Sequence, residues 1–262
     1  MARLPLKISV ITVTRNAAPL LERTMHSVES QDYPFVEHLI IDGNSDDHTL
    51  TLVHHYMERN SQREIAHEIN CLSEADEGIY DAMNKGLALL TGRYVVFLNS
   101  GDTFASEHTL SLVAELAESG SRQAGVVYGD TNIVDDAGHF VRRRRLSPPD
   151  ALKWEDFRFG MLVCHQAFFA RVDLARETRY NLKYRYSADF DWCIRIMQLA
   201  HKRDAPLVNA FQPLDNYLQG GTSKRFRRRS LIERFRIMVS YFGWTTTLGE
   251  HLWFVLRAIL RR

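Results

Sequence analysis

The stretch VEHLIIDGNSDDHT, residues 36–49, carries the pattern that decides the fold. Its first half is apolar and β-branched, which is typical of a buried strand, and the apolar run stops at Asp42-Gly43. The polar residues 45–47 that follow are good N-caps, so the sequence predicts a helix over residues 49–59. A buried strand, a polar turn and a helix therefore follow one another within a short segment.

The same pattern recurs through the first hundred residues. Repeated alternation of strand and helix predicts an α/β fold with a mostly parallel sheet and helices on both faces. In such sheets ligands bind beyond the carboxyl ends of the strands, where Asn16, Asp42, Asp76 and Asp102 would converge on one rim. The predicted strands are 7–14, 36–42, 66–72 and 93–99, and the other predicted helices are 17–30 and 79–90.

The second half of the chain is less regular. We predict a hairpin around residues 136–138 and find neither an internal repeat nor a low-complexity linker. One domain with a C-terminal appendage is the simplest description. The remaining predictions are helices at 107–119 and 189–200 and strands at 125–130, 164–171 and 207–218.

Composition and charge narrow the class of protein. With 45% apolar and 25% charged residues the chain has an average globular composition, and its 3 scattered cysteines show no metal-ligand spacing. Arg3, Pro5 and Lys7 argue against a secretory signal, and no apolar run is long enough to span a bilayer. We therefore expect a cytoplasmic protein with reduced thiols.

The charge is unevenly distributed along the chain. Residues 223–262 hold ten Lys and Arg against two acidic residues, a net charge of +8, whereas residues 1–222 carry −7. This basic tail also contains Trp, Phe, Leu and Ile, the composition of an amphipathic helix that lies in a membrane interface. The alternative is that the tail packs on the rest of the chain or on a second subunit, as in a homo-oligomer.

Carboxylates that converge on one rim need a cation among them. Mg²⁺ and Mn²⁺ prefer hard oxygen ligands and combine one or two carboxylates with substrate phosphates. The chain has no GxxxxGK[ST] loop and no GxGxxG after its first strand. A nucleotide bound at this rim would therefore depend on a metal for its diphosphate.

Four motifs in register resemble the family 2 glycosyltransferases, closest to bacterial enzymes of the colanic acid and lipopolysaccharide type. The resemblance is dense over about residues 7–105 and thinner to about 223, through CHQAFF, YSADFDW and GGTS. The four motifs are ISVITVTRN, IIDGNSDDHT, SEADEGIYDAMNKGL and GRYVVFLNSGD.

The resemblance implies a GT-A, Rossmann-like fold and an inverting transfer from a nucleotide-diphosphate sugar, most naturally a UDP-sugar. The acceptor would be a hydroxyl of a glycan or lipid-linked molecule in cell-surface polysaccharide synthesis, and Mg²⁺ or Mn²⁺ would assist. Residues 1–222 would form the catalytic domain, with a nucleotide-binding half (1–105) and an acceptor-binding half (106–222). The enzyme would lie at the inner face of the cytoplasmic membrane through residues 223–262.

The resemblance also implies roles for residues of the nucleotide-binding half. Thr14 and Asn16 would border the nucleotide, Asp42 would accept a hydrogen bond from the base, and Asp76 would approach the base or ribose. Asn84 would help to hold the donor.

For the metal, Asp102 of NSGD would be the ligand, with Asn99 in place of the family's first acid. The base that activates the acceptor hydroxyl would be Asp189, with Asp191 as a lesser candidate, although Ala188 replaces the usual preceding Glu.

Two further groups would lie around the reacting atoms. The turn that contains Gly221, Ser223 and Lys224 would fold over the diphosphate, and His165 and Gln166 would lie near the acceptor or metal.

Three other functions remain open from the residues. A sugar nucleotidyltransferase shares the sheet and metal but should show a Gly-rich basic loop after strand one. A catalytically inactive nucleotide-sugar binder fits the departures at Asn99 and Ala188. A nucleic-acid binder fits the basic tail but leaves the acidic rim unexplained, so we expect no nucleic-acid partner.

Overall fold

Parallel strands form the first half of the sheet, in the order β3-β2-β1-β4. The structure is a computed structural model that describes residues 5–220 and 226–259. Ile8 of β1 lies opposite Val36 of β2 and Tyr94 of β4, so these apolar strands are in register and end at one edge. The bounds are β1 Ile8–Thr14, β2 Val36–Asp42, β3 Glu68–Ser73 and β4 Tyr94–Phe97.

The second half of the sheet mixes strand directions. β8 runs antiparallel to β4 and β6, and β9 runs parallel to β6. β5 pairs antiparallel with β9 at the end of the sheet, and β7 pairs antiparallel with β6. This half carries the irregular segments that the sequence pattern left poorly defined. The bounds are β5 Thr103–Phe104, β6 Val126–Val134, β7 Phe140–Arg143, β8 Phe168–Arg171 and β9 Leu207–Leu218.

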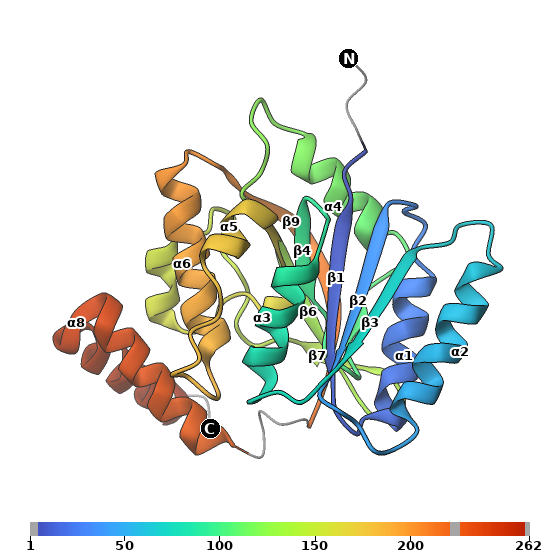
Figure 1. Ribbon diagram of the computed structural model, residues 1–262. Coiled ribbons are helices and arrows are strands. Elements are labelled where there is room, and N and C mark those ends of the chain that lie inside the picture. The colour runs from blue at the N-terminus through green and yellow to red at the C-terminus, as the bar shows by residue number, and fades with distance from the viewer. Residues whose placement is uncertain (1–4, 221–225, 260–262) are drawn as a thin grey trace.

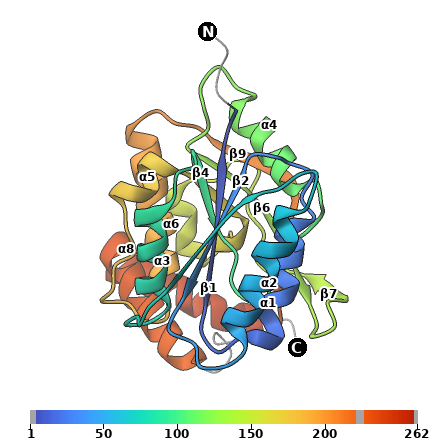
Figure 2. The same cartoon turned by 45° about the vertical axis from the view of Figure 1, so that its right-hand side comes forward.

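Helices cover both faces of the sheet, which confirms the predicted α/β class. Figures 1 and 2 show α1, α2 and α4 on one face and α3, α5 and α6 on the other. Ile40 of β2 packs with α1 and α2, whereas its neighbours Leu39 and Ile41 join the main core. The bounds are α1 Ala18–Glu29, α2 Thr49–Ser61, α3 Ile79–Leu89, α4 Thr109–Glu118, α5 Val172–Glu177 and α6 Ala188–Lys202.

Some local predictions need correction. The expected strand at 164–171 begins as the 3-10 turn η2 (His165–Ala167) and becomes β8 only at Phe168. β4 ends at Phe97, because Asn99 and Asp102 already close a turn through the Asp102 N–H and the Asn99 carbonyl. The sequence pattern did not predict the short α5, β5 or the 3-10 helix η1 (Trp154–Phe159).

The C-terminal segment forms the helix α8 (Arg227–Ile259), which is kinked at Gly243. Gly243 has φ 77°, a left-handed conformation that an L side chain would resist, so it separates two helical halves. Ile237 and Met238 of the first half belong to the main core, and Phe242 stacks on Trp154 of η1. Within residues 5–220 and 226–259, no helix has the length and apolar character needed to cross a bilayer.

Candidate active site

The loops after β1 and β2 are joined by hydrogen bonds through Asn16. Asn16 adopts φ 49°, its N–H donates to Ser45 Oγ at 2.8 Å, and its Oδ1 accepts from the Asp46 N–H at 3.0 Å. Thr14 ends β1 with its Oγ1 buried and, within the described residues, without a hydrogen-bond partner. The two residues predicted to border the nucleotide therefore lie together, and Thr14 has an unused hydroxyl.

Asp42 is fully buried at the end of β2, where its carboxylate organises the loop. Its Oδ2 accepts from the Ser45 N–H at 2.9 Å and from Ser73 Oγ at 2.7 Å, and its Oδ1 accepts from Ser45 Oγ at 2.5 Å. These bonds tie the ends of β2 and β3 together. A role in base recognition stays a prediction, and Oδ1, which accepts a single hydrogen bond, keeps a lone pair for it.

Asp76 lies against the loop after β2 because Gly43 has no side chain. A Cβ at Gly43 would lie 2.3 Å from Asp76 Oδ2. The carboxylate is held there by the Gly78 N–H, which donates to Oδ1 at 2.8 Å. Asp76 therefore joins Thr14, Asn16 and Asp42 at the carboxyl edge of the parallel strands, as the sequence predicted.

Asn84 is placed differently from the rim residues. Its Nδ2 donates to the Tyr180 carbonyl at 3.0 Å and its Oδ1 accepts from the Tyr180 N–H at 2.8 Å. Both polar atoms of the side chain are thus engaged with one backbone unit, which fastens α3 to the segment before α6. The predicted contact with the donor remains untested.

Asp189 lies at the centre of a polar network at the start of α6. Tyr80 Oη donates to its Oδ1 at 3.1 Å, and His165 Nδ1 lies 3.5 Å from its Oδ2. Asn99 Nδ2 lies 3.2 Å from His165 Nε2, which leaves the His165 Nδ1 proton facing Asp189. Segments far apart in the sequence therefore orient one carboxylate.

The charge of Asp189 is stabilised by its neighbours. Burial is the largest influence and raises its pKa, but the hydrogen bond from His165, the electrostatic effect of that ring and the positive charge of Arg234 together lower the pKa below its usual value. Asp189 is therefore ionised at neutral pH, which is the state that can accept a proton from a hydroxyl.

Asp191 is engaged in a structural ion pair. Arg195 Nε donates to its Oδ2 at 2.8 Å, and Tyr241 Oη of α8 donates to its Oδ1 at 2.8 Å. The carboxylate is buried and both of its oxygens are occupied. Of the two candidate bases, Asp189 alone lies in the network with His165 and Asn99.

Asp102 is buried and faces inward. Its Oδ1 accepts from the Leu218 N–H at 2.9 Å and its Oδ2 accepts from Gln166 Nε2 at 2.8 Å. Burial raises its pKa to about 6, against the lowering effect of these two hydrogen bonds. Gln166 therefore positions Asp102, and Asp102 in turn holds the end of β9.

The predicted metal ligands fit a divalent cation poorly in this arrangement. Asn99 Oδ1 is buried without a partner among the described residues, but the Asp102 oxygens are both hydrogen-bonded. Within residues 5–220 and 226–259, no group of three or more His, Cys, Asp or Glu side chains could hold a metal ion. Each Asp102 oxygen keeps a lone pair, but the carboxylate is buried, so an ion could bind it only if the side chain or the groups that cover it moved.

The predicted phosphate turn lies outside the described residues. Gly221, Ser223 and Lys224 fall in the stretch 221–225, so their predicted role stays a prediction.

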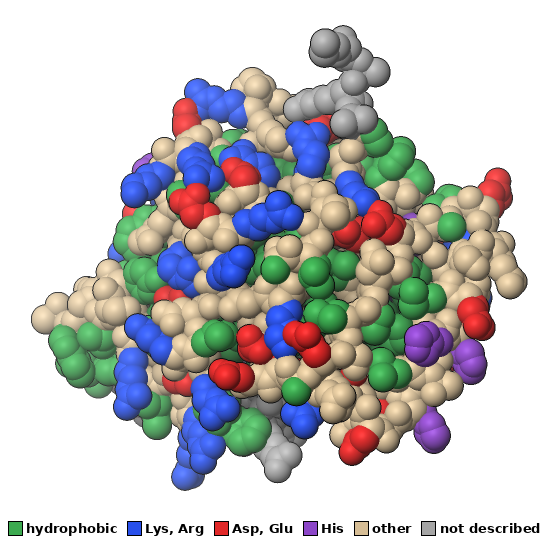
Figure 3. Space-filling view, in the orientation of Figure 1, with side chains coloured by type: hydrophobic (Ala, Val, Ile, Leu, Met, Phe, Trp, Pro, Cys, Tyr) green, Lys and Arg blue, Asp and Glu red, His purple; other side chains and the backbone are tan. Residues whose placement is uncertain are grey.

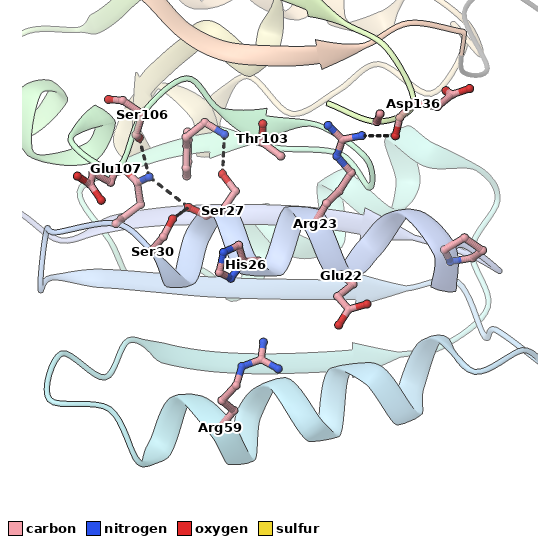
Figure 4. Close-up of a pocket in the computed structure, with 14 residues that line it drawn as sticks. Glu22, Arg23, His26, Ser27, Ser30, Arg59, Thr103, Ser106, Glu107 and Asp136 are labelled. Carbon is pink, nitrogen blue, oxygen red and sulfur yellow. Dashed lines mark hydrogen bonds between the residues drawn. The ribbon is translucent and has the colours of Figure 1, made fainter. Parts of the chain in front are cut away.

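A polar cavity of about 760 Å³ lies elsewhere, over α1 and β5 (Figure 4). Arg23 lines the cavity, and its Nη1 donates to the Asp136 carbonyl at 3.2 Å. None of the predicted site residues lines this cavity. The strand ends, not this cavity, therefore hold the candidate active site.

Helix α8 contributes residues to the site that the sequence pattern did not assign. Glu233 accepts hydrogen bonds from the N–H groups of Arg185, Tyr186 and Ser187, at 2.9, 2.7 and 3.1 Å. This carboxylate therefore fixes the loop that leads into Asp189. The basic, aromatic composition of the tail predicted a membrane contact and gave no signal for this inward-facing role. Tyr80 lies within the motif SEADEGIYDAMNKGL, but the motif alone indicates no role for its hydroxyl.

Comparison with protein families agrees with this geometry. Residues 9–178 match the model of "Glycosyl transferase family 2". A PGL/p-HBAD biosynthesis glycosyltransferase of Mycobacterium bovis is 33% identical over 188 residues, which cover 71% of this chain and 68% of the relative. The amylovoran biosynthesis glycosyltransferase AmsB of Erwinia amylovora is 29% identical over 221 residues, covering 81% of this chain and 69% of AmsB.

Solved structures show the same fold at low sequence identity. S. aureus TarS 1–349 in complex with UDP superposes with a TM-score of 0.66 and 17% identity, covering 90% of this chain and 65% of that one. The mannosyltransferase PcManGT from Pyrobaculum calidifontis, in complex with GDP-Man and Mn²⁺, gives a TM-score of 0.64 and 19% identity, covering 90% of this chain and 64% of that one.

Proposed function

The chain belongs to glycosyl transferase family 2, and from that premise we propose that it transfers a sugar from a UDP-sugar to an acceptor hydroxyl with inversion. The acceptor is a glycan or a lipid-linked molecule of cell-surface polysaccharide synthesis, which the name of the AmsB relative supports. Membership of this family favours sugar transfer over the nucleotidyltransferase and binding-protein alternatives.

The single observation that carries the proposal is the orientation of Asp189. The carboxylate is ionised, largely buried, and held by Tyr80 and by His165, whose ring contacts Asn99 just beyond the carboxyl end of β4. A general base must be ionised and fixed within reach of the proton that it removes, and such catalysis is typically worth about 10²–10⁴-fold. Asp189 meets both conditions.

The reaction then follows from the chemistry of the substrates. The acceptor oxygen attacks the anomeric carbon as its proton passes to Asp189. The bond from that carbon to the diphosphate oxygen breaks on the opposite face, and the nucleoside diphosphate leaves with the electron pair. Attack opposite the leaving group inverts the anomeric configuration. Thr14, Asn16, Asp42 and Asp76 hold the uridine at the neighbouring strand ends.

The predicted metal ligands Asn99 and Asp102 fit a divalent cation poorly as they are placed. Family members commonly use a divalent cation, and PcManGT was solved with Mn²⁺. When bound, such an ion neutralises charge on the leaving diphosphate. We assign no step to it here. Calorimetric titration of UDP with and without Mn²⁺, on wild type and Asp102→Ala, tests whether Asp102 turns outward to hold the ion.

The function is tested by binding and turnover together. Calorimetric titrations of UDP, GDP and dTDP should show selective binding of UDP. Asp189→Asn should retain that binding and lower UDP release from UDP-hexose donors by at least about 100-fold, whereas Asp191→Asn should not. Product anomers read by NMR test inversion. Folded protein that binds none of the three nucleotides would overturn the proposal.

We further propose that the enzyme works at the inner face of the cytoplasmic membrane through the outer face of α8. Trp244, Leu248 and Leu252 recur at helical spacing and are 63, 49 and 66% exposed, while Thr247 between them is buried. Leu231 and Ile232 of the first half are also exposed. Figure 3 shows hydrophobic side chains at the α8 end of the molecule with Lys and Arg side chains beside them.

An apolar helix face flanked by arginines suits an anionic bilayer, because the apolar side chains enter the interface and the guanidinium groups meet the headgroups. Arg228 and Arg229 supply this exposed positive charge. Sedimentation with phosphatidylglycerol vesicles should capture the protein, and phosphatidylcholine vesicles should not. Trp244→Ser with Leu248→Ser should abolish capture. A concentration-dependent dimer without capture would assign the face to a second copy of the chain instead.

A further inference from the structure

Arg234 lies on the inner face of α8, beside Asp189. Its guanidinium carbon is 5.4 Å from the ring centroid of Phe190, the residue that follows Asp189 in α6. Its positive charge acts on both Asp189 and Tyr80. The helix is anchored here by Glu233 and by the buried Ile237, so Arg234 is held at the site.

The guanidinium group has no hydrogen-bonding partner in the part of the chain that the structure describes. Its Nε is buried and unpaired, and no carboxylate oxygen of residues 5–220 and 226–259 lies within 4.0 Å of it. Burial disfavours its charged form and lowers its pKa. Nε is the donor of this guanidinium that is closed off from water, and a buried donor without a partner is costly. Such an arrangement is explained if an anion completes it.

A second positive charge lies in the same region. Arg144 repels Arg234, and its Nη1 already donates to the carbonyls of Leu146 and Leu162, both at 3.1 Å. Arg144 is therefore fixed by backbone carbonyls, and an anion that enters beside the two groups would lower their mutual repulsion. The planar fork of arginine matches phosphate oxygens in a bidentate geometry.

We propose that Arg234 binds a phosphate group of the substrates, so that α8 completes the active site with an anion-binding residue. The inference rests on the proposed function, since the reaction brings a diphosphate to Asp189. The phosphate source is the nucleoside diphosphate of the donor or the diphosphate of a lipid-linked acceptor, and the experiment below separates the two.

The competing explanation is that Arg234 only balances the charge of Asp189. In that case its removal would raise the pKa of Asp189 and leave phosphate binding unchanged. The absence of an ion pair between them among the described residues argues against this role. The two explanations therefore differ in whether removal of Arg234 weakens phosphate binding.

The test compares Arg234→Met with Arg236→Met. Arg236 is an exposed arginine two residues further along α8. Titrations use UDP, uridine, inorganic diphosphate and farnesyl diphosphate. For Arg234→Met we expect UDP and diphosphate affinities to fall by about 10- to 100-fold, the loss of a charge-assisted hydrogen bond, while uridine binding is unchanged. Arg234→Lys should recover part of the affinity. Arg236→Met should bind all four ligands as wild type does.

Thermal unfolding separates ligand binding from structural support. Without ligand, Arg234→Met should unfold at about the same temperature as wild type, because the buried Nε that it removes makes no hydrogen bond among the described residues. Loss of affinity for UDP assigns the donor phosphate, and loss for farnesyl diphosphate alone assigns the acceptor; both support the proposal. Unchanged affinity for every phosphate ligand, or weaker binding that only accompanies a lowered unfolding temperature, overturns it. Failure of wild type to bind UDP would instead overturn the proposed function.

Discussion

The carboxylate of Glu233 accepts a hydrogen bond from the backbone N–H of Tyr186 at 2.7 Å, across 47 residues of sequence. The same carboxylate also binds the N–H groups of Arg185 and Ser187. Because Asp189 follows two residues after Ser187, α8 determines how helix α6 begins. A segment predicted as an appendage thus shapes the candidate active site.

Replacing Glu233 should therefore impair stability and turnover together. Glu233→Ala leaves three backbone donors without their acceptor, and we expect the free energy of unfolding to fall by about 2 kcal/mol, with weaker transfer. Glu250→Ala, in the second half of the same helix, is the control. Urea unfolding and UDP release measure the two effects. Equal free energies of unfolding and equal rates of UDP release in the two variants would show that the loop is held by other contacts.

Tyr80→Phe should shift the pH dependence of transfer. The variant removes the hydroxyl that donates to Asp189 Oδ1 at 3.1 Å and so destabilises the ionised carboxylate. We expect the acidic limb of the kcat/KM profile to move to higher pH, and kcat/KM at neutral pH to fall by roughly tenfold.

Tyr180→Phe is the matched control, since the Tyr180 ring stacks on Tyr80 at 5.3 Å. Its hydroxyl is buried without a hydrogen-bond partner in the described part of the chain, so its loss should leave the profile unchanged. A profile for Tyr80→Phe that coincides with wild type would remove Tyr80 from the mechanism.

Asp191→Asn should lower stability more than activity. The variant breaks the buried pair with Arg195 and weakens the bond from Tyr241, so we expect a loss of about 2 kcal/mol in the free energy of unfolding. Turnover of the folded fraction should fall far less than in Asp189→Asn. The opposite ranking in UDP-release assays would make Asp191 the base.

Gly43→Ala should displace Asp76. The new Cβ would lie 2.3 Å from Asp76 Oδ2, so the carboxylate must leave its place at the rim. We expect UDP to bind about tenfold more weakly, the cost of one hydrogen bond to a charged group. Gly249→Ala is the control, because nothing lies within 4 Å of its Cβ. Unaltered UDP affinity in Gly43→Ala would exclude Asp76 from nucleotide binding.

His38 should make the protein less stable in mild acid. It is fully buried between Thr12 Oγ1 and Tyr56 Oη, and burial lowers its pKa from 6.5 to about 3. Below pH 6.5 the unfolded chain binds a proton that the folded protein does not, so stability falls as the pH falls from 6.5 towards 3.

At pH 5 this effect amounts to about 2 kcal/mol relative to neutral pH. His38→Gln should therefore show a flatter dependence of the free energy of unfolding on pH between 5 and 7.5, measured in urea. His54→Gln, at an exposed position of α2, is the control. Parallel curves for His38→Gln and wild type would refute this assignment.

The sequence by itself determined the sheet of the first half and the identity of its rim. Alternating apolar strands and polar turns are local signals, so they predicted β1 to β4 and placed Asn16, Asp42, Asp76 and Asp102 at one edge. The hydrogen bonds between Asn16 and Asp46 and the contact of Gly43 with Asp76 agree with that prediction.

Only the tertiary structure decided which acids are available for chemistry. Asp189 and Asp191 are two residues apart and alike in sequence, but the first meets Tyr80 and His165 and the second meets Arg195 and Tyr241. Asp102 likewise turns inward to the Leu218 N–H, 116 residues away. These partners come from distant segments, and the direction of a side chain depends on which distant donors packing brings to it. The inward placement of α8 has the same cause, because a composition that suits a membrane does not reveal that the opposite face of the helix holds the backbone before Asp189.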